Sequence, residues 1–220
     1  MSRRANKPPQ MTLREITYTQ AIDFLLPRHY SGRKPQIRWA FGWYDDTDTL
    51  QAVCTFGKPA SHHLCIGICG TDYAHHVFEL NRLCRLDTCS APLSQFVAGC
   101  LKALRQHDVI VVSYSDTAMN HHGYIYQATN FLYTGRTVER TDKWTPDNKH
   151  SRHYDKDAIQ KYRKVRSSKH RYIFFATSNK RLRKEWQSHL NYPVLAYPKG
   201  DNSEDYELGF VLQPTIIPVS

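Results

Sequence analysis

The sequence predicts an α/β (α+β) fold in which helices flank a mixed central sheet. Between residues 13 and 137, runs with strand character alternate with runs of helix character, an order typical of this class. The apolar residues make up 40% of the 220 residues, enough for a folded core and too many for intrinsic disorder. A strongly basic, aromatic-rich extension follows the core. We therefore expect three parts: a flexible tail over 1–11, a core over 12–137 and an extension over 138–220.

The first predicted elements follow the polar tail directly. Leu13–Ile16 predicts a short strand. A helix is expected from Thr19, whose hydroxyl can cap it, to Pro27, which cannot continue it. Its apolar residues are Ile22, Leu25 and Leu26.

A hairpin comes next. Ile37–Tyr44 alternates between apolar and polar residues, Asp45–Asp48 is rich in turn formers, and Leu50–Phe56 predicts the returning strand. Gly57–Tyr73 has no clear period and predicts a loop with at most one helical turn. His75–Leu86 predicts the next strand.

The remaining core elements have clearer patterns. A helix is expected from Ser94, because its apolar residues fall on one helical face: Phe96, Val97, Cys100, Leu101 and Leu104. Val109–Tyr114 predicts a buried strand, His121–Thr129 a helix and Phe131–Thr137 a strand.

The extension over 138–220 is expected to pack on the core and to contact nucleic acid. A polar linker over Val138–Lys149 precedes a predicted helix at Asp155–Val165 and a strand at Arg171–Ala176. Ser178 is expected to cap a last helix that ends at Leu190.

The charge of the chain is concentrated in this extension. The whole chain has 30 Lys and Arg against 20 Asp and Glu, a net charge of +10, while residues 149–184 alone have 13 basic and 2 acidic residues. This concentration, with aromatic residues between the cations, favours a polyanionic partner and DNA first, although a charged run can also be a solvated face. The candidate DNA contacts are Arg163, Lys164, Arg166, Lys169, Arg171, Lys180, Arg181, Arg183 and Lys184.

The sequence has no run of 18 apolar residues, which excludes a transmembrane helix, and no apolar segment follows its basic N-terminus. We therefore expect no membrane partner. The six cysteines lack the paired spacing of a zinc ribbon, so we expect reduced, mostly buried thiols in a cytoplasmic protein.

Three stretches resemble one protein family. They are Arg28–Ser31 (RHYS), Val77–Leu83 (VFELNRL) with Pro92–Ser94, and Val111–Asp116 (VVSYSD) with His122–Gly135. Together they resemble the Mom family of phage DNA-modification proteins over about residues 25–200. The resemblance implies a GNAT-like acyltransferase fold and the conversion of adenine in phage DNA to an N6-carbamoylmethyl derivative. This modification would protect the DNA from restriction in the cytoplasm of the bacterial host.

The candidate catalytic residues are Asp116, Tyr126, Tyr124, Ser113 and Glu79. Asp116 follows a buried strand, where α/β sites collect, and can take the N6 proton of adenine or accept a hydrogen bond from it. Its alternative role is to cap the helix that starts near His121. The two tyrosines are candidates for a general acid or for stacking on a flipped base, or are simply core residues. In a regular strand Glu79 and Arg82 would point to opposite faces of the sheet, whereas a bulge in this strand would change the face to which Glu79 points.

The resemblance also implies acetyl-CoA. The candidate contacts are Arg82 and the start of the following helix, at Leu93, Ser94 and Gln95. The preceding loop, Asp87–Ser94, lacks the glycines of ordinary GNAT enzymes, but a helix N-terminus still offers free amide groups to a phosphate. Ser94 is either a donor to the cofactor or the helix cap, and Arg82 is either a ligand or a structural partner of Glu79 or Asp116.

Iron is the metal that the resemblance implies, and His29 and Tyr30 are its candidate ligands. The alternative is a loop histidine beside a packed tyrosine. Three His-His pairs, at residues 62–63, 75–76 and 121–122, are further candidates that are more often solvated.

Two other function classes stay open. One is an acyl-CoA-dependent N-acetyltransferase acting on protein or RNA, and the other is a nucleic-acid-binding protein without enzymatic activity. Our main prediction remains an enzyme that acts on double-stranded DNA with a flipped adenine. The oligomeric state stays open, with a homodimer as one alternative.

Overall fold

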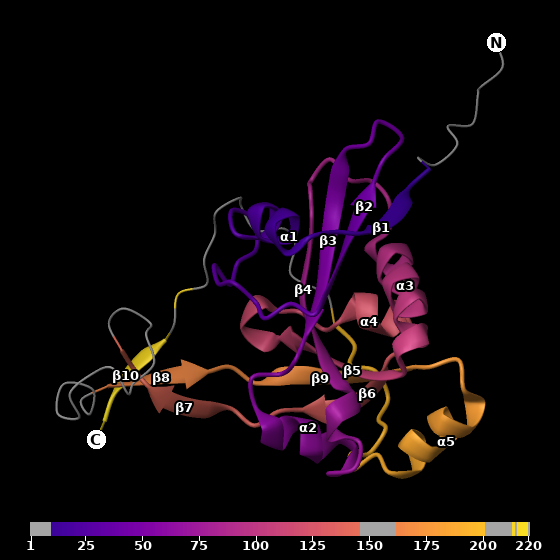
Figure 1. Cartoon of the computed structure of the whole chain (residues 1–220). Helices are drawn as coiled ribbons and strands as arrows, with labels where there is room; N and C mark the ends of the chain where they lie inside the picture. The colour runs from indigo at the N-terminus through magenta and orange to yellow at the C-terminus, as the bar shows by residue number, and fades with distance from the viewer. Residues whose placement is uncertain (1–9, 146–161, 201–212, 214, 220) are drawn as a thin grey trace.

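The computed structural model in Figure 1 describes residues 10–145, 162–200, 213 and 215–219. A seven-stranded sheet has the order β1-β2-β3-β4-β5-β9-β6, and a three-stranded sheet has the order β10-β8-β7. The strands of the large sheet are β1 (Thr12–Glu15), β2 (Trp39–Tyr44), β3 (Leu50–Gly57), β4 (Val77–Arg85), β5 (Val109–Asp116), β6 (Leu132–Arg136) and β9 (Lys169–Ala176). Those of the small sheet are β7 (Arg140–Lys143), β8 (Tyr162–Arg166) and β10 (Ile216–Pro218).

The large sheet is mixed, as predicted. Strands β4 and β5 are parallel, and the other neighbouring pairs are antiparallel. The parallel pairing joins only Val77–Glu79 to Ile110–Val112, and beyond these residues the two strands separate. The hydroxyl of Ser113 donates to the carbonyl oxygen of Leu80 at 3.0 Å, just where the separation begins.

Helices cover both faces of this sheet (Figure 1). Helices α3 (Leu93–Leu104) and α4 (Tyr124–Ala128) cover one face, while α2 (His62–Cys69) and α5 (Lys180–Ser188) cover the other. Helix α1 (Tyr18–Leu25) packs on β2 and β3. Three 3₁₀ turns complete the order: η1 (Ala74–His76), η2 (Arg105–His107) and η3 (Thr117–Met119).

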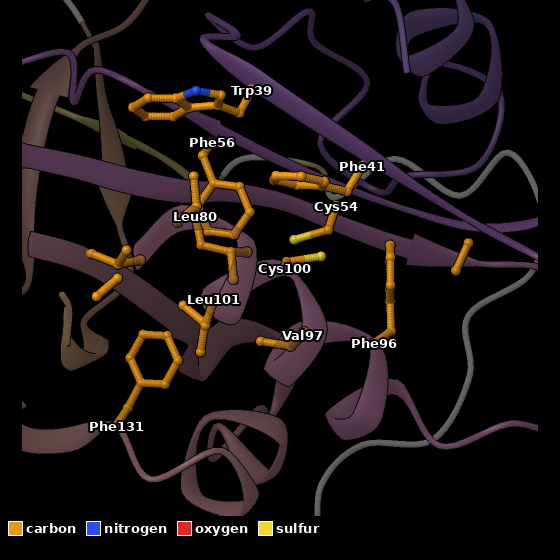
Figure 2. Packing of buried hydrophobic residues seen from close by; sticks show 14 of the residues in the cluster. Trp39, Phe41, Cys54, Phe56, Leu80, Phe96, Val97, Cys100, Leu101 and Phe131 are labelled. Atoms are coloured by element: carbon orange, nitrogen blue, oxygen red, sulfur yellow. The ribbon is translucent and has the colours of Figure 1, made fainter. Parts of the chain in front are cut away.

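The largest core lies between α3 and the sheet (Figure 2). Phe96 of α3 stacks on Trp43 of β2, with ring centroids 5.2 Å apart, and Leu101 and Leu104 are fully or almost fully buried. The predicted apolar face of this helix is therefore confirmed. All six cysteines are buried free thiols, as expected, and Cys54 and Cys100 lie within this core.

Three predicted helix caps are wrong by one or two residues. Thr17, not Thr19, caps α1, in a capping box with Gln20. Asn179, not Ser178, caps α5 with its side-chain oxygen. Pro92 is the N-cap residue of α3 and Ser94 lies within its first turn, so Ser94 is not the cap. Several polar residues near a helix start can serve as caps, and only the backbone geometry selects one.

Helix α2 occupies part of the segment expected to be a loop. Ser61 caps its start, and Gly70, with φ at 91°, follows its end. Its buried residues are Cys65, Ile68 and Cys69. The short apolar face consists of cysteine and isoleucine between glycines, a composition that hides the helical period.

The small sheet lies where a linker and a helix were predicted. Strand β7 is within the predicted linker, and Tyr162–Val165, the end of the predicted helix Asp155–Val165, belongs to strand β8. Residues 155–161 of that prediction, and 1–9 of the predicted tail, lie outside the described residues. The residue pattern of β8 is compatible with a helix or a strand, and this segment is a strand because it pairs with β7 and β10.

The predicted boundary at residue 137 does not separate the core from an extension. Strand β9 lies inside the large sheet between β5 and β6, and pairs with β5 along all eight residues of Val109–Asp116. The indole of Trp186 on α5 is fully buried against Phe175. Residues 169–190 are therefore part of the core. None of the helices in the described ranges combines the length and the apolar character needed to cross a membrane.

We predict that Trp186→Ala destabilises the whole domain. The fully buried indole makes its contribution by packing, because its N–H has no hydrogen-bond partner within the structure. Loss of such a side chain typically costs about 3–5 kcal/mol of unfolding free energy. Urea unfolding followed by circular dichroism measures this loss, and the exposed neighbour Gln187→Ala should change it by no more than about 0.5 kcal/mol. Separate unfolding transitions for core and extension would contradict the single core.

Candidate active site

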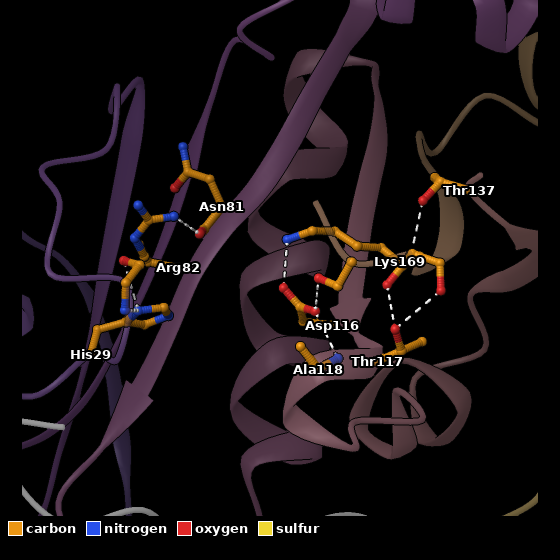
Figure 3. Close-up of polar contacts among 11 residues, drawn as sticks. His29, Asn81, Arg82, Asp116, Thr117, Ala118, Thr137 and Lys169 are labelled. Carbon is orange, nitrogen blue, oxygen red and sulfur yellow. Dashed lines mark hydrogen bonds and ion pairs between the residues drawn. The ribbon is translucent and has the colours of Figure 1, made fainter. Parts of the chain in front are cut away.

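A cleft of about 1860 Å³ opens where β4 and β5 separate. The second half of β4 and the end of β5 form its two sides, and the loop of residues 28–33 after α1 closes one end. Strand β8 and the start of α4 contribute further lining residues. Figure 3 shows Arg82 on the β4 side and Asp116 on the β5 side.

A bulge in β4 turns its functional residues toward this cleft. Thr55 pairs with Arg82 and Phe56 with Leu80, so Asn81 is an extra residue in β4. The bulge that was expected is confirmed, and it allows Glu79 and Arg82, three positions apart, to line the same cleft. The Asn81 side chain accepts a hydrogen bond from Thr55 Oγ1 and donates one to the Gln36 carbonyl oxygen, both at 2.7 Å.

Arg82 holds the loop beside the cleft. Its Nη1 donates to the Asn81 carbonyl oxygen at 2.6 Å and its Nη2 to the Arg33 carbonyl oxygen at 3.3 Å. Among the described residues, its buried Nε has no hydrogen-bond partner. Burial lowers the pKa of Arg82, while Tyr30 and Glu79 oppose that change. Arg82 is therefore partly structural, with one donor left for a ligand.

Glu79 is a poorly solvated carboxyl group on the cleft wall. Burial raises its pKa, and the positive charges of Arg82 and Lys169 only partly oppose this. Within the described part of the chain no group donates a hydrogen bond to its carboxylate. A carboxyl group with a raised pKa and free oxygens is suited to exchange a proton with a bound molecule.

Asp116, in contrast to Glu79, is paired with a positive charge and accepts hydrogen bonds. Its Oδ2 lies 2.9 Å from Lys169 Nζ, and its Oδ1 accepts from Ser167 Oγ at 2.5 Å and from the Ala118 amide at 3.0 Å. Burial alone raises the pKa of Asp116, but the hydrogen bonds from Ser167 and Lys169 and the charge of Lys169 outweigh it, so the pKa is lowered. Asp116 does act as a cap, but of η3; Gly123 is the N-cap residue of α4.

His29 and Tyr30 stack in the loop, with ring centroids 4.5 Å apart. Burial, with the charges of Arg82 and His121, lowers the pKa of His29 to about 3, so its ring is neutral. The Ser31 amide donates to its Nδ1 at 3.2 Å, which leaves the proton on Nε2. Burial, with the charge of Asp116, raises the pKa of Tyr30 to about 12.

The iron site expected at His29 and Tyr30 is not supported. Among the described residues, no three His, Cys, Asp or Glu side chains are grouped closely enough to hold a metal ion. His29 and Tyr30 line the cleft as a stacked pair, and their role as metal ligands stays a prediction.

The remaining catalytic candidates differ in exposure. Tyr124 is 68% exposed and lines the cleft, so its ring can contact a bound molecule. Tyr126 packs between Phe131 and Tyr172, with ring centroids 5.3 and 5.2 Å away, and burial raises its pKa despite a hydrogen bond with Ser113. Ser113 is fully buried and bridges β4 and β5. Ser113 is therefore a supporting residue, whereas Tyr126 also lines the cleft and stays a predicted catalytic residue.

The start of α3 reaches the cleft through Leu93, whereas Ser94 and Gln95 are not among the lining residues. No side chain caps the first turn of α3. Its first amide groups thus have no side-chain acceptor in the part of the chain that the structure describes, which suits an anionic group such as a phosphate.

The basic candidates lie in two separate regions. Lys164, Arg166 and Lys169 line the cleft, while the cations of α5 lie on the opposite side of the molecule (Figure 1). Arg171 donates to Thr134 and lies over the ring of Tyr192, with its guanidinium carbon 3.3 Å from the ring centroid.

Sequence reasoning missed the partner of Asp116 and two cations of the cleft. Lys169 was expected to contact DNA, but it neutralises Asp116 because β9 pairs with β5. Arg140 and Arg33 line the cleft although neither belongs to the densest basic run. No local pattern identifies them, because they meet only through the sheet.

The mixed sheet, with a parallel pair that separates over a polar cleft, defines the GNAT-like α/β class that was predicted. The chain belongs to the Mom protein family, whose family model matches residues 10–199. No curated protein matches the chain.

Solved acetyltransferase structures resemble it at low identity. An N-acetyltransferase from Staphylococcus aureus Mu50 has a TM-score of 0.48 and 11% identity, covering 76% of this chain and 99% of that one. The spermidine/spermine N-acetyltransferase SpeG from Vibrio cholerae has a TM-score of 0.46 and 8% identity, covering 76% and 93%. A Bacillus subtilis acetyltransferase in complex with CoA has a TM-score of 0.42 and 14% identity, covering 76% and 98%.

We predict that Asp116→Asn destabilises the protein at neutral pH by about 1.5–3 kcal/mol, the usual worth of hydrogen bonds to a charged group. Because the folded-state pKa of Asp116 is lowered, its stabilisation is present above the unfolded pKa of about 3.9 and disappears as the pH falls through the folded value. Urea unfolding of wild type and variant between neutral and acidic pH measures the difference.

The exposed ion pair between Arg14 and Asp48 supplies a control. Asp48→Asn should cost no more than about 1 kcal/mol. A difference between wild type and Asp116→Asn that stays constant down to acidic pH would contradict the lowered pKa.

Proposed function

We propose that this protein is a transferase that acts on the exocyclic N6 amine of adenine in DNA and attaches a carbamoylmethyl group. In the cytoplasm of an infected bacterium, this modification would protect phage DNA from restriction. Membership of the Mom family supports the reaction class. The observation that carries the proposal is a cleft that holds two carboxyl groups, Glu79 and Asp116, in opposite electrostatic states.

The acceptor amine lies inside a DNA duplex, so the nucleotide has to be extruded before it can react. Tyr124 supports this step, because its exposed ring at the cleft can stack on a flipped base. Stacking of a base on an aromatic side chain is worth about 1–3 kcal/mol, comparable to the cost of unstacking.

The two carboxyl groups can then take different roles in the reaction at N6. Forming the new bond at N6 requires that the donor carbon give up its leaving group and that the nitrogen lose one proton. Glu79, with its raised pKa and free oxygens, accepts that proton. Asp116 stays ionised beside Lys169 and accepts a hydrogen bond from the amine. This division moves the role of base from Asp116, the sequence candidate, to Glu79.

The start of α3 fits the acetyl-CoA that the family resemblance implies. Its uncapped amide groups suit the pyrophosphate, Leu93 lines the cleft, and Arg82 retains one unpartnered donor. Acetyl-CoA would supply a two-carbon unit activated at its carbonyl carbon, with the CoA thiolate as the leaving group, and the amide nitrogen of the carbamoylmethyl group would come from a further co-reactant. Residues of the α3 end would hold the donor while those near β8 receive the acceptor.

We predict that plasmid DNA from bacteria that express the protein contains adenine enlarged by one carbamoylmethyl group, as measured by mass spectrometry of nucleosides. Glu79→Gln should reduce the modification by about 10²–10⁴-fold, because it removes the proton acceptor. Glu139→Gln, a change of the same kind on the same cleft, is the matched control and should modify normally.

Unmodified DNA with acetylated protein or RNA would instead identify an acyl-CoA-dependent N-acetyltransferase. No modification of any of these polymers would identify a binding protein without enzymatic activity. Normal modification by Glu79→Gln would remove Glu79 from the role of base.

A further inference from the structure

The small sheet forms one wall of the cleft and carries an unusual concentration of positive charge. Five of the nine residues of β7 and β8 are Lys or Arg, and one, Asp142, is acidic. Arg140, Lys164 and Arg166 line the cleft together with residues of β4 and β5.

The strand register places these cations on one face. Arg140 pairs with Arg166, and Asp142 with Lys164. Directly paired residues share a face of a sheet, and so do residues two apart along a strand. One face therefore carries Arg140, Asp142, Lys164 and Arg166; we name it the basic wall.

The basic wall is electrostatically unfavourable for the sheet alone. Two arginines stand directly opposite each other, an arrangement that destabilises strand pairing. Asp142 lies 2.6 Å from Arg166 and 3.9 Å from Arg140, so a single carboxylate forms ion pairs with both arginines. Burial and the charges of Arg33 and Arg166 lower the pKa of Lys164, although the charge of Asp142 opposes them. A bound polyanion would relieve this repulsion.

The chain connects the basic wall directly to the reacting groups. Strand β8 ends at Arg166, Ser167 donates to Asp116, and Lys169 pairs with the same carboxylate. Arg33 lies within electrostatic reach of Lys164 and lines the same cleft from the loop after α1. Phosphates on the basic wall would thus flank a base that enters the cleft.

The cations of α5 have a different position. Helix α5 lies at the opposite end of β9 from the small sheet (Figure 1), and Arg183 donates to the carbonyl oxygen of Thr177, which precedes the helix. A DNA strand that delivers a nucleotide to the cleft would not pass over them.

We propose that the basic wall, with Arg33, binds the phosphodiester backbone of the DNA strand whose adenine enters the cleft, and that α5 does not take part. This inference rests on the proposed function for the identity of the polyanion. It assigns DNA binding to Arg140, Lys164 and Arg166 and excludes the α5 part of the basic segment.

The test compares two triple variants with the same change of charge. Arg140→Ala/Lys164→Ala/Arg166→Ala removes the basic wall, and Lys180→Ala/Arg181→Ala/Lys184→Ala removes the exposed cations of α5. Affinity for a labelled DNA duplex is measured by fluorescence anisotropy over a series of salt concentrations. Each phosphate contact contributes about 0.9 to the slope of log K against log salt, so the basic-wall variant should lose about 2–3 units. The α5 variant should keep the wild-type slope.

A further variant tests whether the triple substitution acts by misfolding the small sheet. Arg140→Lys/Arg166→Lys preserves the charge and should keep the slope near that of wild type. Wild-type affinity and slope in the basic-wall triple variant would overturn the proposal. An equal loss in both triple variants would also overturn it, because the attraction would then come from net charge alone.

Nucleoside mass spectrometry separates this inference from the proposed function. Modified adenine in wild type together with full DNA binding by the basic-wall variant would refute only the basic wall. Salt-dependent DNA binding that requires the basic wall, without any modified adenine in wild type, would support the wall and refute only the reaction.

Discussion

The short pairing between β4 and β5 is the constraint on which the rest of the structure depends. The two parallel strands hold together over Val77–Glu79 and Ile110–Val112, and then each keeps a different partner, β3 for β4 and β9 for β5. Backbone groups along the gap are left without a neighbouring strand, and such groups need another partner. The cleft that results is lined by the polar and charged residues of both strands, and the hydroxyl of Ser113 marks its inner end.

The position of β9 sets the electrostatics of this cleft. By pairing with β5 from Val109 to Asp116, it places Lys169 at the end of the strand where Asp116 lies. The resulting ion pair keeps Asp116 ionised, while burial raises the pKa of Glu79 on the other wall despite the charges of Arg82 and Lys169. Two carboxyl groups in one cleft thus differ in state because their strands have different neighbours.

The same topology divides the basic segment. In sequence, the cations from Arg163 to Lys184 form one run, yet β9 passes through the sheet between them. Lys164 and Arg166, before it, line the cleft, and the cations after it lie on α5 at the other end of β9. A single charged run in the sequence therefore becomes two surfaces with different access to the site.

The sequence by itself determined the mixed α/β class, the β2–β3 hairpin, the apolar face of α3, the buried thiols and the resemblance to the Mom family, because local periodicity and contiguous motifs carry that information. Only the tertiary structure decided that β9 belongs to the sheet, that β8 is a strand, that Lys169 neutralises Asp116 and that His29 packs as a neutral ring. These outcomes depend on which distant segments meet and on how much water remains around them. A strand partner, an ion pair and a desolvated imidazole are properties of neighbours far away in sequence, and no local pattern records them.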